Sequence, residues 1–291
     1  MNDPKPQPSR PTLEQLHATI AVLGDDHGRL QETARQQLLT WGDVAVPALR
    51  EGAEAEHMQT RTRCRALLRS LELRALLDRI SDLRLDRIGQ ASAPSLLEGA
   101  VLAASMVRTF VPKTRQLAAR LRREANALRR DCEGRSLPVC ARLLAERMHT
   151  GFGLQGCDAE LLDVDSVLID RVLKNGIGAP VSLSLIYILV ARWAGLSVAG
   201  VALPDHFLVR LHGPRPVLLD PFYGGRAITK ADCARYLRAN GYERVREHLR
   251  DLTDREVLIR YLRCLRSASS HRPTGEARQS LGEALSLLET S

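Results

Sequence analysis

The segment 181–194 is apolar on almost every side of a helix. Its apolar side chains are Val181, Leu183, Leu185, Ile186, Ile188, Leu189, Val190 and Trp193. A surface helix keeps one polar face, so a helix that is apolar all round is expected to be buried. Pro180 suits the first position of this helix, and Gly195 suits its end. Any fold of this chain must therefore enclose one central helix.

Three short segments after this helix are rich in branched residues and predict β-strands. They are 198–203, 207–211 and 217–219, and the turn between the last two lies at 212–215. Most of the remaining chain has helical periodicity. Helices are expected at 95–110, 114–131, 137–149, 165–173, 253–266 and 275–289. The predicted fold class is therefore α+β, mainly helical, with a small antiparallel sheet.

Composition breaks along the chain predict its organisation. Residues 1–11 contain four prolines and few apolar side chains, which is typical of a disordered tail. Apolar residues at three- and four-residue spacing make 12–73 a helical region. We expect a charged linker helix and a break at 74–94, a main domain at 95–268 and a C-terminal helix at 269–291.

The net charge of +8 does not indicate a nucleic-acid-binding face. Of the 42 basic residues, 38 are arginines, which suggests a bias of the source genome. The arginines also alternate with acidic residues, as in Arg84 and Asp86 or Arg255 and Glu256. This alternation is typical of a solvated surface. We therefore do not expect nucleic acid among the partners.

The sequence predicts neither a metal site nor a cofactor site. The six cysteines have no CxxC spacing, and the eight histidines are scattered without ligand spacing. No glycine-rich phosphate loop is present. The sequence does not start with an apolar leader, and the longest uncharged apolar-rich run, 179–191, is too short to cross a bilayer. We therefore expect reduced thiols, no membrane association and a cytoplasmic location.

A histidine and an aspartate flank the expected hairpin near Gly213. Opposed residues of an antiparallel pair have a constant number sum, here about 426, so His206 is expected directly opposite Asp220. Such residues bring their Cβ atoms to roughly 5 Å, where a carboxylate can orient an imidazole. A His–Asp pair beside the start of a buried helix is the framework of Cys–His–Asp acyl-transfer enzymes. A purely structural hydrogen bond at the strand ends is the open alternative.

Three ordered motifs resemble those of SirB-type transglutaminase-like proteins. Residues 178–187, Gly-Ala-Pro-Val-Ser-Leu-Ser-Leu-Ile-Tyr, resemble the family's Gly-Ile-Pro-Ile-Ser-Leu-Ser. Residues 203–210 resemble its Pro-Gly-His-Phe segment, with Asp205 in place of the usual glycine. Residues 219–225 match Asp-Pro-Phe-x-Gly-Gly. The resemblance covers residues 95–268 and implies a papain/transglutaminase-like core, in which the central helix packs on an antiparallel sheet.

The flanking regions resemble other helical modules. The run 25–49 resembles a HEAT-type repeat, and 61–71 resembles part of a second one. Such helical pairs hide their apolar faces by stacking, and several are usually needed. With about one and a half repeats, 12–73 is expected to be a HEAT-like arm or a plain helical extension. The C-terminal helix at 269–291 resembles the remnant of a tetratricopeptide-like region.

The expected nucleophile is absent at the start of the central helix. An active transglutaminase-like enzyme has Gly-x-Cys there, and two alignments place either Pro180 or Ser182 at the cysteine position. Neither residue supplies a thiol. Cys157 lies about twenty residues before the helix, in a predicted loop. The other candidate thiols lie on helical patterns typical of core positions: Cys233 and Cys264.

Three functions of different classes follow from this pattern. We favour a non-catalytic transglutaminase-like protein that binds a peptide or protein partner. The alternative is a hydrolase or acyltransferase in which Ser182 is the nucleophile, His206 the base and Asp220 the orienting group. The third is a regulatory or scaffolding factor, which the family's association with the regulation of gene expression implies.

Overall fold

The computed structural model describes residues 10–85, 93–157, 163–243, 245–269 and 275–290. The chain divides into two compact units, Met1–Asp78 and Arg79–Ser291. Residues 1–9 of the expected disordered tail and 90–92 of the expected Ala/Ser/Pro break lie outside the described residues, whereas the last two residues of that break, 93 and 94, begin a helix. None of the described helices combines the length and the apolarity needed to cross a membrane.

The first unit is helical, as expected for 12–73. It contains α1 (Leu13–Leu23), α2 (Gly28–Trp41), α3 (Val46–Gly52) and most of α4 (Met58–Ser81). Thr12 starts α1 through a capping box with Gln15. These helices share one apolar core, which includes Leu16, Ile20, Leu38, Leu49 and Leu67. Helix α4 runs through the expected boundary at 73/74 without a break.

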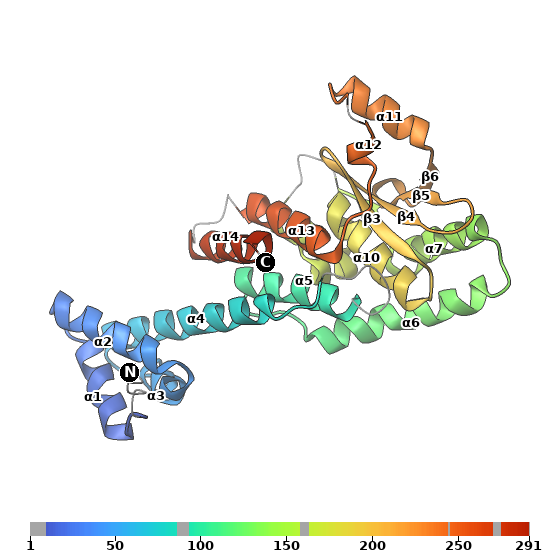
Figure 1. The fold of residues 1–291 in the computed structure, drawn as a ribbon. Helices are drawn as coiled ribbons and strands as arrows, with labels where there is room; N and C mark the ends of the chain where they lie inside the picture. The colour runs from blue at the N-terminus through green and yellow to red at the C-terminus, as the bar shows by residue number, and fades with distance from the viewer. Residues whose placement is uncertain (1–9, 86–92, 158–162, 244, 270–274, 291) are drawn as a thin grey trace, which may run out of the picture. The chain divides into compact units, whose positions relative to one another are not determined.

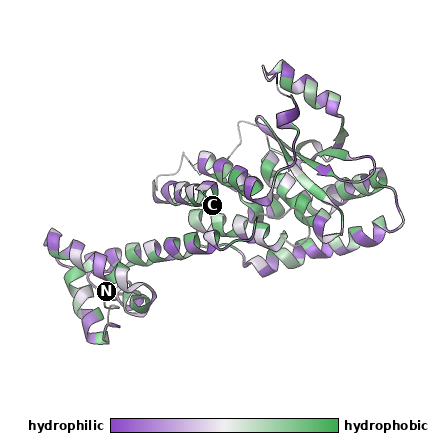
Figure 2. Cartoon of the chain, viewed as in Figure 1, coloured by the Kyte–Doolittle hydropathy of each residue, from purple (hydrophilic) through white to green (hydrophobic). Residues whose placement is uncertain are grey.

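The second unit is built around α10 (Pro180–Trp193), the expected central helix. Its side chains from Val181 to Arg192 are all buried. Helix α10 packs against β3 (Val198–Leu203) and β4 (His206–Leu211) on one side and against α6 (Thr114–Cys132) and α13 (Asp254–Ala268) on others. Figure 2 shows this helix as a largely hydrophobic segment inside a shell of mixed hydropathy. The apolar all-round pattern therefore predicted its burial correctly.

The sheet is antiparallel, with the strand order β3-β4-β5-β6. Strands β5 (Val217–Asp220) and β6 (Arg226–Ile228) follow β4, and β6 was not predicted because only three residues form it. The face opposite to α10 is covered by α11 (Lys230–Ala239). A second apolar cluster fills that interface: Val201, Leu203, Leu208, Leu218, Cys233 and Leu237.

The remaining elements surround this core. They are α5 (Ala93–Val107), α7 (Leu137–Phe152), β1 (Gln155–Gly156), α8 (Val164–Val167), α9 (Ile169–Asn175), β2 (Ile177–Gly178), η4 (Pro221–Tyr223), α12 (Val245–His248) and α14 (Gly275–Thr290). The helix expected at 165–173 is two short helices, because Leu168 has an extended backbone with ψ 119°. The short parallel pair of β1 and β2 was not predicted.

A fully buried ion pair joins the end of α10 to the start of α13. The guanidinium of Arg192 lies 2.7 Å from both carboxylate oxygens of Asp254, and neither side chain is exposed to solvent. Two further guanidinium nitrogens of Arg192 lie 3.5 Å from the carbonyl oxygen of Val198, where β3 begins. The close pairing offsets the cost of burying the two charges, so losing one partner leaves an uncompensated charge in the core.

We expect Arg192→Met and Asp254→Asn each to lower the free energy of unfolding by about 3–5 kcal/mol. The double variant Arg192→Met/Asp254→Leu should recover much of this loss, because it removes both charges. The chain has two tryptophans, so urea unfolding in a Trp41→Phe background reports on Trp193 in the second unit.

The matched control is Arg263→Gln, which breaks the largely exposed pair with Glu289 and should cost less than about 1 kcal/mol. A loss for Arg192→Met no larger than that of the control would contradict the role of the buried pair.

Candidate functional site

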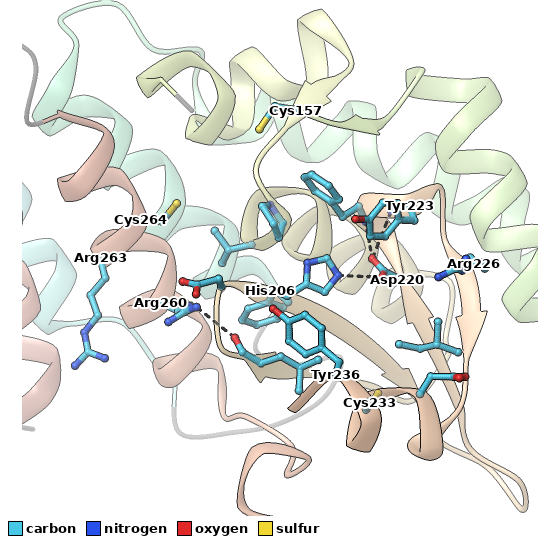
Figure 3. Close-up of a pocket in the computed structure, with 18 of the residues that line it drawn as sticks. Cys157, His206, Asp220, Tyr223, Arg226, Cys233, Tyr236, Arg260, Arg263 and Cys264 are labelled. Carbon is cyan, nitrogen blue, oxygen red and sulfur yellow. Dashed lines mark hydrogen bonds and ion pairs between the residues drawn. The ribbon is translucent and has the colours of Figure 1, made fainter. Parts of the chain in front are cut away.

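A pocket of about 750 Å³ opens where the N-terminus of α10 meets the ends of β3, β4 and β5. Helices α11 and α13 form its other walls (Figure 3). Its lining includes both members of the predicted His–Asp pair. The described residues contain no group of three or more His, Cys, Asp or Glu side chains that could hold a metal ion.

His206 and Asp220 contact each other, but they are not directly opposed as predicted. The loop between β4 and β5 covers 212–216, and Val209 pairs with Leu219, which gives a sum of 428 instead of about 426. The pairing of β4 with β5 is therefore shifted by two residues from the predicted register. A two-residue slide keeps every side chain on the same face of the sheet, so the pair meets diagonally. Nε2 of His206 lies 2.9 Å from Oδ2 of Asp220.

Asp220 organises the wall that carries the aromatic side chains. Its Oδ1 accepts hydrogen bonds from the backbone N–H groups of Phe222 at 3.2 Å and Tyr223 at 3.4 Å, and so caps η4. The Phe222 ring packs edge-on against the His206 ring, with centroids 5.7 Å apart, and Tyr223 lies 6.0 Å from it. One carboxylate thus orients both the imidazole and the turn that carries its aromatic neighbours.

The tautomer of His206 follows from its partner. An ionised carboxylate only accepts hydrogen bonds, so in the neutral form of the ring Nε2 carries the proton and Nδ1 is an acceptor. Nδ1 makes no hydrogen bond to a described residue, and the side chain is 16% exposed. An acceptor oriented in this way can bind a donor group or take a proton from it.

The turn before His206 explains a departure from the family motif. Asp205 has φ 52°, in the left-handed region that favours glycine. Aspartate tolerates this conformation better than most residues, so the turn keeps its shape at a modest cost. On the same side of the pocket, Tyr236 of α11 donates its hydroxyl to the carbonyl oxygen of Pro204 at 3.0 Å. This bond ties α11 to the turn.

The two candidate nucleophile positions have different surroundings. Pro180 occupies the first turn of α10 and lines the pocket with Val181. Ser182 is fully buried, and its hydroxyl donates to the carbonyl oxygen of Val167 at 2.7 Å. Ser182 is not among the residues that line the pocket. The structure therefore brings His206 and Asp220 together and gives the Ser182 hydroxyl a backbone partner outside the pocket.

Three cysteines line the pocket, which sequence spacing did not predict. Cys157 follows β1, and its N–H donates to the carbonyl oxygen of Gly178 at 3.1 Å. Figure 3 shows Cys157 among the residues around the pocket, apart from the His206–Asp220 pair. Burial raises the pKa of Cys264 to about 11, and burial also raises the pKa of Cys233. Thiols with raised pKa values are weak nucleophiles at neutral pH.

Close packing accounts for the second of the two glycines after η4. Gly224 and Gly225 have φ 69° and 75°. A Cβ atom on Gly225 would lie 2.5 Å from Cβ of Ala145 and 2.7 Å from the Tyr187 hydroxyl, whereas one on Gly224 would meet no atom within 4 Å. Tyr187 is buried, and burial followed by the charge of Asp220 raises the pKa of its hydroxyl. Gly225 thus allows the chain after η4 to lie against Tyr187 of the central helix.

Comparison with known proteins finds similarity within this unit. The model of a family described as the transglutaminase-like superfamily matches residues 109–263, more than half of the 291-residue chain. A UPF0162 protein of Xylella fastidiosa strain 9a5c is 41% identical over 98 residues, which cover 33% of this chain and 32% of that relative. Another from strain Temecula1 / ATCC 700964 is 34% identical over 122 residues, 40% of this chain and 43% of that relative. The chain thus spans less than half the length of these curated relatives. No solved structure matches the chain.

The two glycines of the turn provide a matched pair of variants. Gly224→Ala should cost only the strain of a positive φ, about 1 kcal/mol. Gly225→Ala should cost about 2–4 kcal/mol, because its methyl group also meets Ala145 and Tyr187. Urea unfolding followed by Trp193 fluorescence measures both. Equal losses for the two variants would show that η4 is not held against α10 by close contact.

Proposed function

The chain belongs to the transglutaminase-like superfamily, and we propose that it is a non-catalytic member whose pocket binds a peptide or protein segment. The observation that carries this proposal is which residues stand in the first turn of the central helix. Pro180 lines the pocket there and has no nucleophilic group, while the hydroxyl of Ser182 is bound to Val167 outside it. Among the described residues, neither Pro180 nor the Ser182 hydroxyl offers a nucleophile to the orienting pair of His206 and Asp220.

Exposed aromatic side chains support binding. Tyr223 is 62% exposed and Tyr236 is 40% exposed, and both line the pocket. Tyrosines supply large amphipathic contact area at low entropic cost, and they are enriched at energetically important positions of protein interfaces. Phe222, Val181 and Ile228 add apolar surface between them. This combination suits an extended peptide whose side chains fill a partly apolar groove.

The finer assignments belong to the same proposal. The motifs at 178–187, 203–210 and 219–225 support a SirB-type protein, and the helical first unit supports a HEAT-like arm. We propose that the protein acts in the cytoplasm, where the bound partner links it to regulation. The alternative is a hydrolase that uses Ser182, His206 and Asp220. Such an enzyme would require the Ser182 hydroxyl to leave the Val167 carbonyl and enter the pocket.

Covalent labelling distinguishes the two functions. We expect no adduct when the protein is treated with a fluorophosphonate probe, because the Ser182 hydroxyl is buried and bound. Intact-mass analysis of wild type and Ser182→Ala should give the same unmodified protein, with a known serine hydrolase labelled in parallel. An adduct that maps to Ser182 and disappears in Ser182→Ala would establish the hydrolase instead.

Peptide selection tests the binding function directly. Phage-displayed random peptides selected on the wild-type protein should lose at least about tenfold in affinity for Tyr223→Ala/Tyr236→Ala. The control is Tyr242→Ala, since Tyr242 is also exposed and does not line the pocket. Failure to enrich any peptide, or equal losses in the control, would contradict peptide binding in this pocket.

A further inference from the structure

Two of the three arginines that line the pocket, Arg226 and Arg260, form no ion pair with a described residue, and Arg260 is the more buried of the two. Arg263 pairs with Glu289 at 2.8 Å, and Arg226 lies over the Tyr223 ring at 5.8 Å. Arg260 is half-buried and donates one hydrogen bond, at 3.4 Å, to the carbonyl oxygen of Leu203. It forms no ion pair with any residue that the structure describes. A guanidinium has five N–H donors, so most of those on Arg260 are left for a ligand.

The carboxylates that line the pocket do not neutralise Arg260. Asp220 binds His206 and caps η4. Asp232 accepts hydrogen bonds from Thr229 and pairs with Arg235 at 3.5 Å. Asp205 lies exposed at the rim and makes no ion pair with a described residue. A half-buried guanidinium without a carboxylate favours one supplied from outside.

The neighbours of Arg260 narrow the ligand class. Figure 3 shows Arg260 on the side of the pocket that holds His206 and Tyr236, while Arg263 extends away from them. The free Nδ1 of neutral His206 accepts a hydrogen bond, so it suits a ligand N–H group. A simple inorganic anion offers oxygen acceptors, whereas a peptide offers an N–H group a few atoms from a carboxylate. The pocket thus combines groups for both parts of a peptide.

We infer that the segment held in this pocket is a carboxylate-bearing peptide, whose carboxylate binds Arg260 and whose nearby N–H donates to Nδ1 of His206. This inference rests on the proposed peptide-binding function and adds the chemistry of the ligand. The planar guanidinium matches a carboxylate with two parallel hydrogen bonds. The rings of Phe222 and Tyr223 lie against the His206 ring, where they reduce the access of water to a hydrogen bond made by the imidazole. The carboxylate comes either from a peptide C-terminus or from an Asp or Glu side chain.

Four sub-libraries of random nonapeptides test this inference on the immobilised full-length chain. Their C-termini are free or amidated, and Asp and Glu are included or omitted. We expect retention only where a carboxylate is present, and dependence on the free terminus or on Asp and Glu identifies its source. Arg260→Gln should weaken retention about ten- to hundredfold, and Arg260→Lys should be intermediate because it keeps the charge without the planar fork.

Two further variants serve as controls, one expected to leave peptide retention unchanged and one expected to increase it. Arg266→Gln makes the same chemical change on the same helix and should leave retention unchanged, because Arg266 does not line the pocket. Asp205→Asn removes a negative charge that repels the carboxylate of the peptide, and asparagine tolerates the positive φ of this position. The variant should increase retention about two- to threefold.

The outcomes distinguish a failure of the carboxylate inference from a failure of the proposed peptide binding. Equal retention of the acid-free amidated sub-library, or wild-type retention by Arg260→Gln, would overturn the carboxylate inference and leave peptide binding intact. Retention of no sub-library above the level of Tyr223→Ala/Tyr236→Ala would overturn both.

Discussion

The buried contact between Arg192 and Asp254 is the interaction on which the architecture of the second unit depends. Removing two charges from water costs several kcal/mol per ion, and close paired geometry is required to offset that cost. Both carboxylate oxygens lie 2.7 Å from the guanidinium, and the same side chain reaches the first residue of β3. The contact therefore holds together the end of α10, the start of the sheet and the start of α13.

This arrangement positions two opposite walls of the pocket. Helix α10 enters the pocket with Pro180 at its other end, and α13 carries Arg260 less than two turns after Asp254. The sheet between them supplies His206 and Asp220. A rigid core thus presents an oriented imidazole, a ring cluster and a guanidinium to one cavity. These groups suit the proposed recognition of a peptide segment, and the Ser182 hydroxyl is bound to the Val167 carbonyl oxygen outside the pocket.

The His206–Asp220 pair has structural roles that do not depend on catalysis. Asp220 has structural duties besides orienting His206, since it caps the turn that carries Phe222 and Tyr223. Gly225 allows the chain after that turn to approach Tyr187 of the central helix. The residues of the motif at 219–225 therefore have structural roles, in capping η4 and in close packing. Because Asp220 also binds Nε2 of His206, the imidazole stays oriented with Nδ1 available to a ligand.

The sequence by itself determined the elements and their burial. The pattern of 181–194 predicted a buried central helix, and alternating branched residues predicted strands, because periodicity records which faces meet the core. It also placed His206 and Asp220 on one face, since face depends only on parity. Only the tertiary structure decided their diagonal contact, the backbone partner of Ser182 and the gathering of Cys157, Arg260 and Tyr236 around one cavity. These depend on loop length and on the packing of distant segments, which local pattern does not encode.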